Sequence, residues 1–145
     1  MKRPNGRFSL KIMKTILLFG TFDGVHEGHR SCFLQAKKHA DHLVVAVAPD
    51  GVVVKLKGRP AHSTAEERVR HLKFEPLVDE VVMGDREIGT YEVLSTIKPD
   101  LVGIGYDQYE LAEHLRIWAR SFMPNLILVR LESFEPETYK SSKLV

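Results

Sequence analysis

One short segment constrains the fold of this chain more than any other: an apolar run, a turn with three glycines and a helical pattern. Residues 15–19 are typical of a buried strand, and residues 30–40 show the one-sided apolar spacing of a helix. The turn between them contains His26 and His29. A strand that turns sharply into a helix directs backbone N–H groups and the positive end of the helix dipole at one point, where anions bind. The segment therefore predicts a phosphate-binding turn without a covalent nucleophile.

Strands and helices alternate along the rest of the chain. Ser63 or Thr64 begins a helix with a capping box to Glu66 or Glu67, and residues 52–62, which show no clear period, are interpreted as a small basic loop. The valine-rich run 43–48 is typical of a strand buried on both faces, as in parallel sheets. Further strands are predicted at 80–83, 101–104 and 126–131, and further helices at 90–97 and 111–122. The order predicts a single α/β domain with a doubly wound, five-stranded, Rossmann-like parallel sheet.

The predicted topology indicates where a ligand binds. In doubly wound sheets, ligands lie beyond the carboxyl ends of the strands, where the strand order reverses. The loops that follow the first, second, fourth and fifth strands carry His26, Lys55, Tyr106 and Ser141 respectively. We therefore expect these loops to be neighbours at one edge of the sheet, whereas Trp118 and Phe122 are expected in the core because of their helical spacing.

Composition limits the classes of protein that fit. The length of 145 residues suits one domain, taken as 14–145 after a flexible arm at 1–13. The net charge of +2 argues against nucleic-acid binding, and no apolar run approaches the roughly 20 residues of a membrane span. The single cysteine, Cys32, excludes a disulfide framework and fits a reducing compartment. We expect a cytoplasmic protein; a homodimer remains open.

The turn carries a family resemblance. The run Gly20-Thr21-Phe22-Asp23, followed by His26-x-Gly28-His29, resembles the signature of the cytidylyltransferase-like nucleotidyltransferases, the HxGH type of Rossmann-like fold. Other stretches are similar to archaeal-type FAD synthases: residues 55–60, Glu66-Glu67-Arg68, 105–108 and the tail 139–144. That group's cysteine pair near the closing motif is absent here.

The resemblance implies a reaction. FAD synthases transfer AMP from ATP to FMN with Mg²⁺ or another divalent cation and release pyrophosphate. A CTP-dependent glycerol-3-phosphate cytidylyltransferase, acting on that or a similar small phosphate, is the alternative, and a catalytically inactive nucleotide-binding protein is a third. Both enzymes take small-molecule substrates: ATP or CTP, together with FMN or a small phosphate. The metal is expected on the triphosphate rather than on protein side chains.

Roles follow for the residues of these motifs. His26, His29, Lys55 and Lys57 are assigned to catalysis, the histidines as hydrogen-bond donors to the phosphates and the lysines as point charges. Asp23 is interpreted as a turn cap or as an acceptor ligand, and Arg68 as a partner of Asp107 or of the acceptor's phosphate; Asp107 is alternatively the cap of the following helix. The expected nucleotide-binding set is Gly20, Thr21, Phe22, His26, Gly28, His29, Gly105, Tyr106, Asp107, Gln108, Ser141 and Ser142. The expected acceptor-binding set is Asp23, Lys55, Arg59 and Arg68.

Overall fold

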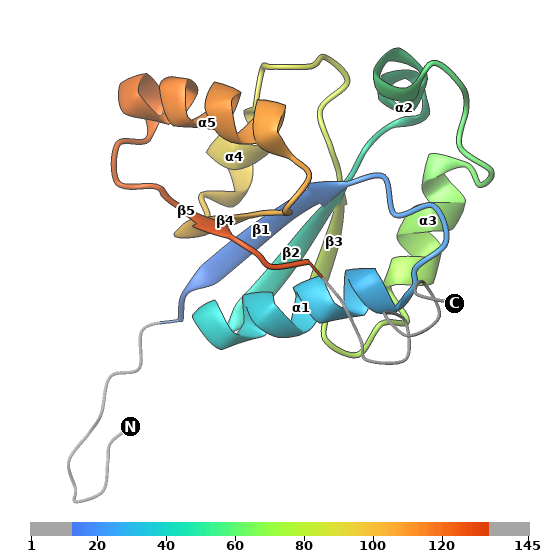
Figure 1. Cartoon of the computed structure of the whole chain (residues 1–145), viewed down its shortest axis with the longest axis horizontal. Coiled ribbons are helices and arrows are strands. Elements are labelled where there is room, and N and C mark those ends of the chain that lie inside the picture. Colours follow the sequence, from blue (N-terminus) through green and yellow to red (C-terminus); the bar gives the residue numbers. More distant parts are fainter. Residues whose placement is uncertain (1–12, 134–145) are drawn as a thin grey trace, which may run out of the picture.

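A parallel sheet of five strands forms the centre of the molecule. The computed structural model describes residues 13–133, and all pairings within its sheet are parallel (Figure 1). The strand order is β3-β2-β1-β4-β5, which confirms the predicted doubly wound topology. The strands are β1 (Thr15–Gly20), β2 (His42–Val47), β3 (Glu80–Met83), β4 (Leu101–Ile104) and β5 (Ile127–Arg130).

Helices cover both faces of the sheet. Helices α1 (Glu27–His39) and α3 (Ala65–Leu72) pack on one face, and α4 (Glu92–Ile97) and α5 (Tyr109–Phe122) pack on the other (Figure 1). Side chains alternate between the two cores, so that Ile16 contributes to the first core and Leu17 to the second. In β2, residues 43–47 are all buried, as predicted for a strand covered on both sides.

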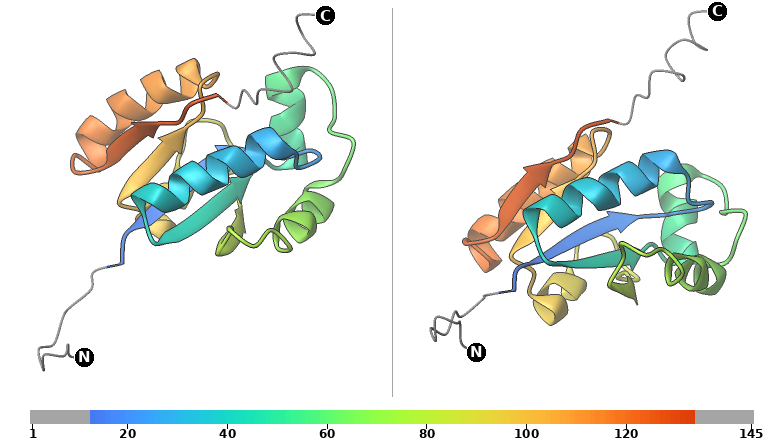
Figure 2. Two further views of the ribbon diagram at one scale, coloured as in Figure 1. Left: turned by 60° about the horizontal axis from the view of Figure 1, so that its bottom comes forward. Right: turned by 90° about the horizontal axis from the view of Figure 1, so that it is seen from below.

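The region predicted as a basic loop is partly a helix. Helix α2 (Asp50–Lys57) lies beyond the ends of the strands, on the side where α1 begins (Figure 2). Val52 and Val53 are buried, while Lys55 and Lys57 are exposed near the helix C-terminus. The prediction of a loop for both lysines was therefore wrong. Two turns are too short for a helical period to stand out, and three consecutive valines disfavour a helix on propensity alone.

Two further details differ from the sequence-based expectation. Helix α1 begins at Glu27 rather than at Arg30, so both histidines belong to the helix start itself. Phe122 was expected in the core, yet it is 68% exposed, because it is the last residue of α5 and its ring stacks on the outside of Trp118. For α3, the structure selects the cap pair Thr64 and Glu67 from the two predicted alternatives.

Candidate active site

The point at which the strand order reverses lies between β1 and β4. The chain passes from β1 towards β2 and β3 on one side, and from β4 towards β5 on the other. Gln108 closes this point: its side-chain amide donates to the carbonyl of Phe19 at 3.1 Å and accepts from the N–H of Gly105 at 2.8 Å. Gln108, and not Asp107, is the N-cap residue of α5, so the alternative of Asp107 as helix cap was wrong. The turns after β1 and β4 are thus joined at the expected ligand edge.

The two histidines cap helix α1 reciprocally. The Nδ1 atom of His26 accepts from the N–H of Gly28 at 3.0 Å, and the Nδ1 atom of His29 accepts from the N–H of His26 at 3.2 Å. The rings stack with their centroids 4.0 Å apart. A nitrogen that accepts a hydrogen bond carries no proton, so each neutral ring has its proton on Nε2. The cap therefore leaves both histidines an Nε2–H donor for an anion.

The electrostatic surroundings keep His29 neutral. Its pKa falls from 6.5 to about 4, chiefly because the ring is partly buried and further because His26, Lys57 and Arg30 are nearby; Asp107 acts in the opposite direction. The imidazole is therefore neutral at pH 7, as its capping bond requires. Lys57 of α2 and Asp107 of the turn after β4 thus both act electrostatically on one histidine ring.

Two glycines make room for the rings of this turn. A Cβ atom on Gly20 would lie 2.7 Å from the ring of Phe22, and one on Gly28 would lie 2.9 Å from Cε1 of His26. Phe22 itself has a φ of 55°, which is unusual for a bulky residue, and its buried ring lies 5.1 Å from that of His29. The absence of a side chain at residue 28 therefore leaves room for the ring of His26.

Arg68 has a position that the sequence did not indicate. Its side chain is completely buried, and its guanidinium donates to the carbonyls of Ser63, Thr21 and Ala48 at 3.1, 2.9 and 2.9 Å. It also pairs with Asp50 at 2.8 Å, so the predicted partnership with Asp107 was wrong. A direct contact with an acceptor would require breaking these bonds. In the structure, Arg68 therefore bonds four segments: the end of β2, the start of α2, the start of α3, and residues 20–29, which run from the end of β1 into α1. We call residues 20–29 the histidine turn.

Asp23 faces a small pocket of about 190 Å³ next to the histidine turn. Its carboxylate accepts from the N–H groups of His62 at 2.7 Å and Ser63 at 3.1 Å, and from Nδ1 of His62 at 3.2 Å. These bonds run to residues 62 and 63, and none within residues 13–133 runs to the backbone of its own turn, so the prediction of a turn cap was wrong. They also lower the pKa of its carboxyl group, the N–H of His62 having the largest effect. The pocket is lined by Thr21, Asp23, Val53, Lys57, Arg59, Pro60, Ala61 and His62.

His62 is a site residue that sequence reasoning missed. It is 39 residues from Asp23 along the chain, and no local pattern links the two. Of the other expected residues, Lys55, Tyr106 and Asp107 are exposed near this edge. Ser141 and Ser142 lie outside the described residues. The chain just after β5 is described: Gln35 of α1 forms two hydrogen bonds with the backbone of Glu132.

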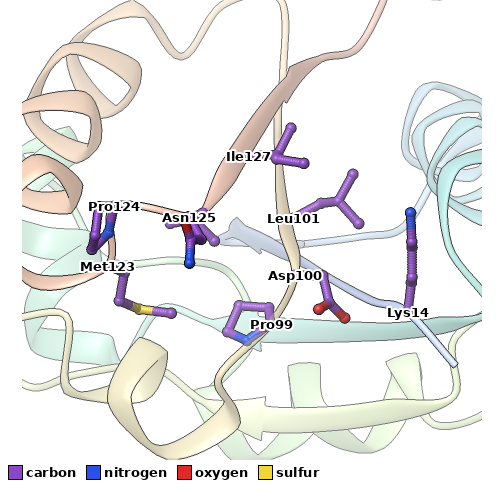
Figure 3. A pocket seen from close by; sticks show the side chains of 9 residues that line it. Lys14, Pro99, Asp100, Leu101, Met123, Pro124, Asn125 and Ile127 are labelled. Atoms are coloured by element: carbon purple, nitrogen blue, oxygen red, sulfur yellow. The ribbon is translucent and has the colours of Figure 1, made fainter. Parts of the chain in front are cut away.

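A larger hollow of about 370 Å³ lies elsewhere, at the amino ends of β4 and β5 (Figure 3). Its walls come from the residue before β1 and from the turns that precede β4 and β5, including Lys14, Asp100 and Asn125. We place the active site at the opposite edge, because the paired histidines and the strand-order reversal coincide there. Within residues 13–133, no helix is long and apolar enough to cross a membrane, and no group of three or more potential metal-binding side chains gathers.

Comparisons with known proteins agree with this geometry. A model of the cytidylyltransferase-like family matches residues 17–144. The FAD synthase of Pyrococcus horikoshii is 34% identical over 131 residues, which cover 90% of this chain and 88% of that protein. The FAD synthase of Ferroglobus placidus is 37% identical over 134 residues, covering 92% and 86% respectively. Among solved structures, the lipopolysaccharide core biosynthesis protein of Thermoplasma volcanium aligns with a TM-score of 0.77 and 25% identity over 85% of this chain and 99% of that one.

Proposed function

Because this chain belongs to the cytidylyltransferase-like family, we propose that it is an FAD synthase, a nucleotidyltransferase that transfers AMP from ATP to FMN. Curated relatives named FAD synthase, 34% and 37% identical over most of both chains, support this choice of substrates. The observation that carries the proposal is the stacked histidine pair, with two Nε2–H donors at the start of a helix. The reaction needs such donors, since it brings two anions together.

The proposed step is an in-line displacement. A phosphate oxygen of FMN forms a bond to the α-phosphorus of ATP, the bond from that phosphorus to the bridging oxygen breaks, and pyrophosphate leaves. The Nε2–H groups of His26 and His29 stabilise the charge on the non-bridging oxygens of the α-phosphate. Because their Nδ1 atoms are held by the helix start, these donors need no reorientation during the reaction.

The basic side of the site receives the acceptor in this proposal. Lys57 lines the pocket beside Asp23, and its positive charge also lowers the pKa of His29. An acceptor phosphate beside Lys57 is therefore near the α-phosphate that it attacks. Arg59 lines the same pocket, and Lys55 adds positive charge to the same end of α2.

The side chains at this edge of the sheet do not form a metal-binding cluster within the described residues. Both oxygens of Asp23 bind His62 and Ser63, and the described residues offer no cage of three or more ligands. We therefore propose that Mg²⁺ arrives bound to the oxygens of the triphosphate and to water, as is usual for this ion. When bound, it neutralises part of the charge on the leaving pyrophosphate.

One assay tests the function. The purified protein is incubated with Mg²⁺ and either ATP plus FMN or CTP plus glycerol 3-phosphate; FAD is quantified by chromatography and pyrophosphate by a coupled assay. We expect FAD and pyrophosphate in equal amounts from the first pair. If pyrophosphate is released only with CTP plus glycerol 3-phosphate, and not with ATP plus FMN, the protein is a cytidylyltransferase. Nucleotide binding without pyrophosphate release from either pair would contradict an enzymatic function.

A further inference from the structure

The pocket beside the histidine turn has an unequal distribution of charge. Three side chains that bear or acquire positive charge line it: Lys57, Arg59 and His62. Its one carboxylate, Asp23, accepts three hydrogen bonds from residues 62 and 63. The remaining wall combines the apolar Val53, Pro60 and Ala61 with the polar Thr21. Such a pocket suits an anionic group attached to a less polar body.

His62 is held at this pocket by one ring nitrogen. Its Nδ1 atom lies 3.2 Å from Oδ2 of Asp23, and an ionised carboxylate only accepts hydrogen bonds, so Nδ1 carries the proton. The side chain is otherwise 88% exposed. This arrangement leaves Nε2 to meet a ligand. Nε2 donates to a phosphate when the ring is charged, and accepts from a P–OH group when the ring is neutral.

We propose that His62 binds the phosphate monoester of the acceptor, with Asp23 orienting its ring. The inference rests on the proposed function and assigns to that reaction a residue outside the glycine and histidine motifs. The phosphate then lies beside both His62 and Lys57, which line the same pocket. In this arrangement His62 contributes to acceptor affinity, and the histidine pair of α1 contributes to the chemical step.

Because the His62 ring is exposed, it can be removed without disturbing the core. His62→Ala removes the imidazole but keeps the N–H groups of residues 62 and 63 that bind Asp23, so the turn is retained. His114→Ala, which changes an exposed histidine on α5, is the matched control. Binding of FMN and of riboflavin is measured by flavin fluorescence, because riboflavin lacks the phosphate. KM values for FMN and ATP are measured in parallel.

We expect His62→Ala to weaken FMN binding and raise the KM for FMN about tenfold, the lower end for a hydrogen bond to a charged group. Riboflavin binding, the KM for ATP and the His114→Ala control should stay within about twofold of wild type. Equal losses for FMN and riboflavin would mean that the ring contacts the flavin rather than the phosphate. Unchanged FMN binding would also contradict the proposal, whereas wild-type protein that neither binds FMN nor makes FAD would contradict the proposed function and this inference together.

Discussion

The histidine turn and the basic segment, residues 55–62, are neighbours that differ in how firmly their side chains are held. In the turn, each ring is held by another group: His26 by Gly28, His29 by His26, and Phe22 by both His29 and Phe33. In the basic segment, Lys55, Lys57 and Arg59 are exposed, and their side chains form no hydrogen bonds or ion pairs within residues 13–133.

This difference separates two tasks. A transition state places the same charge at the same point in every turnover, so fixed donors serve it best. A substrate must enter and leave, and cations whose donors are unoccupied suit its capture. We therefore expect substitutions in the turn to lower kcat and substitutions in the basic segment to change acceptor affinity more.

The largest effect is expected at Arg68, which bonds Thr21 after β1 and also Asp50 and Ser63 on either side of the basic segment. Arg68→Ala leaves the carbonyls of Thr21, Ala48 and Ser63 without their donor and removes the buried partner of Asp50. We expect the free energy of unfolding to fall by about 3–5 kcal/mol, measured by urea denaturation, because three carbonyls lose a charged donor; Asp50 is 56% exposed, so water solvates it once it is unpaired. Arg70→Ala, an exposed change on the same helix, should stay within about 0.5 kcal/mol of wild type. Equal losses in both variants would show that the bonds of Arg68 do not hold the site together.

Within the turn, His29→Ala removes one of the two proposed phosphate donors and one capping bond. We expect kcat to fall by about 10²–10³-fold, the range for loss of one fixed donor, while circular dichroism shows a folded protein. Pyrophosphate release measures the effect, with His114→Ala as the control. Release at the wild-type rate would refute the catalytic role of His29.

The basic segment offers a contrast between two lysines on one helix. Lys57 lines the pocket and influences His29, whereas Lys55 does neither in the part of the chain that the structure describes. We expect Lys57→Ala to lower kcat/KM for FMN about 10-fold to 100-fold, and Lys55→Ala to lower it less than Lys57→Ala. Lys38→Ala, on α1, controls for the loss of one positive charge. A larger effect at Lys55 would reverse the assignment of the two side chains.

The last expected effect is a pH dependence of stability. The pKa of His29 is about 4 in the folded protein against 6.5 ordinarily, so the unfolded chain binds the proton more tightly. The neutral His29 ring contributes fully to the free energy of unfolding above pH 6.5, and this contribution is lost as the pH falls towards 4. Urea denaturation at pH 7.5 and 4.5 should show a larger loss for wild type than for His29→Gln, which has no titrating ring. Parallel losses would show that His29 does not titrate as its surroundings indicate.

Prediction from the sequence succeeded where neighbouring residues carry the signal. Strand β2 is visible as an apolar run because both of its faces are covered, and the order strand, turn, helix around His26 and His29 is visible locally, although α1 begins three residues earlier than predicted. Helix α2 was missed because its two buried valines are adjacent in sequence and its lysines suggest a solvated loop. Phe122 was misplaced because helical spacing does not reveal where a helix extends past the sheet.

The sequence by itself determined the strand–turn–helix unit that places two histidines at a helix start, because its bonds join residues two or three positions apart. Only the tertiary structure showed that Arg68 donates hydrogen bonds to Thr21 and Asp50. It also showed that His62 is hydrogen-bonded to Asp23 at a pocket that Lys57 lines too. These pairs are separated by 18 to 47 residues. Contacts over such distances form only when the sheet brings the ends of β1 and β2 side by side, and no local pattern in the chain encodes them.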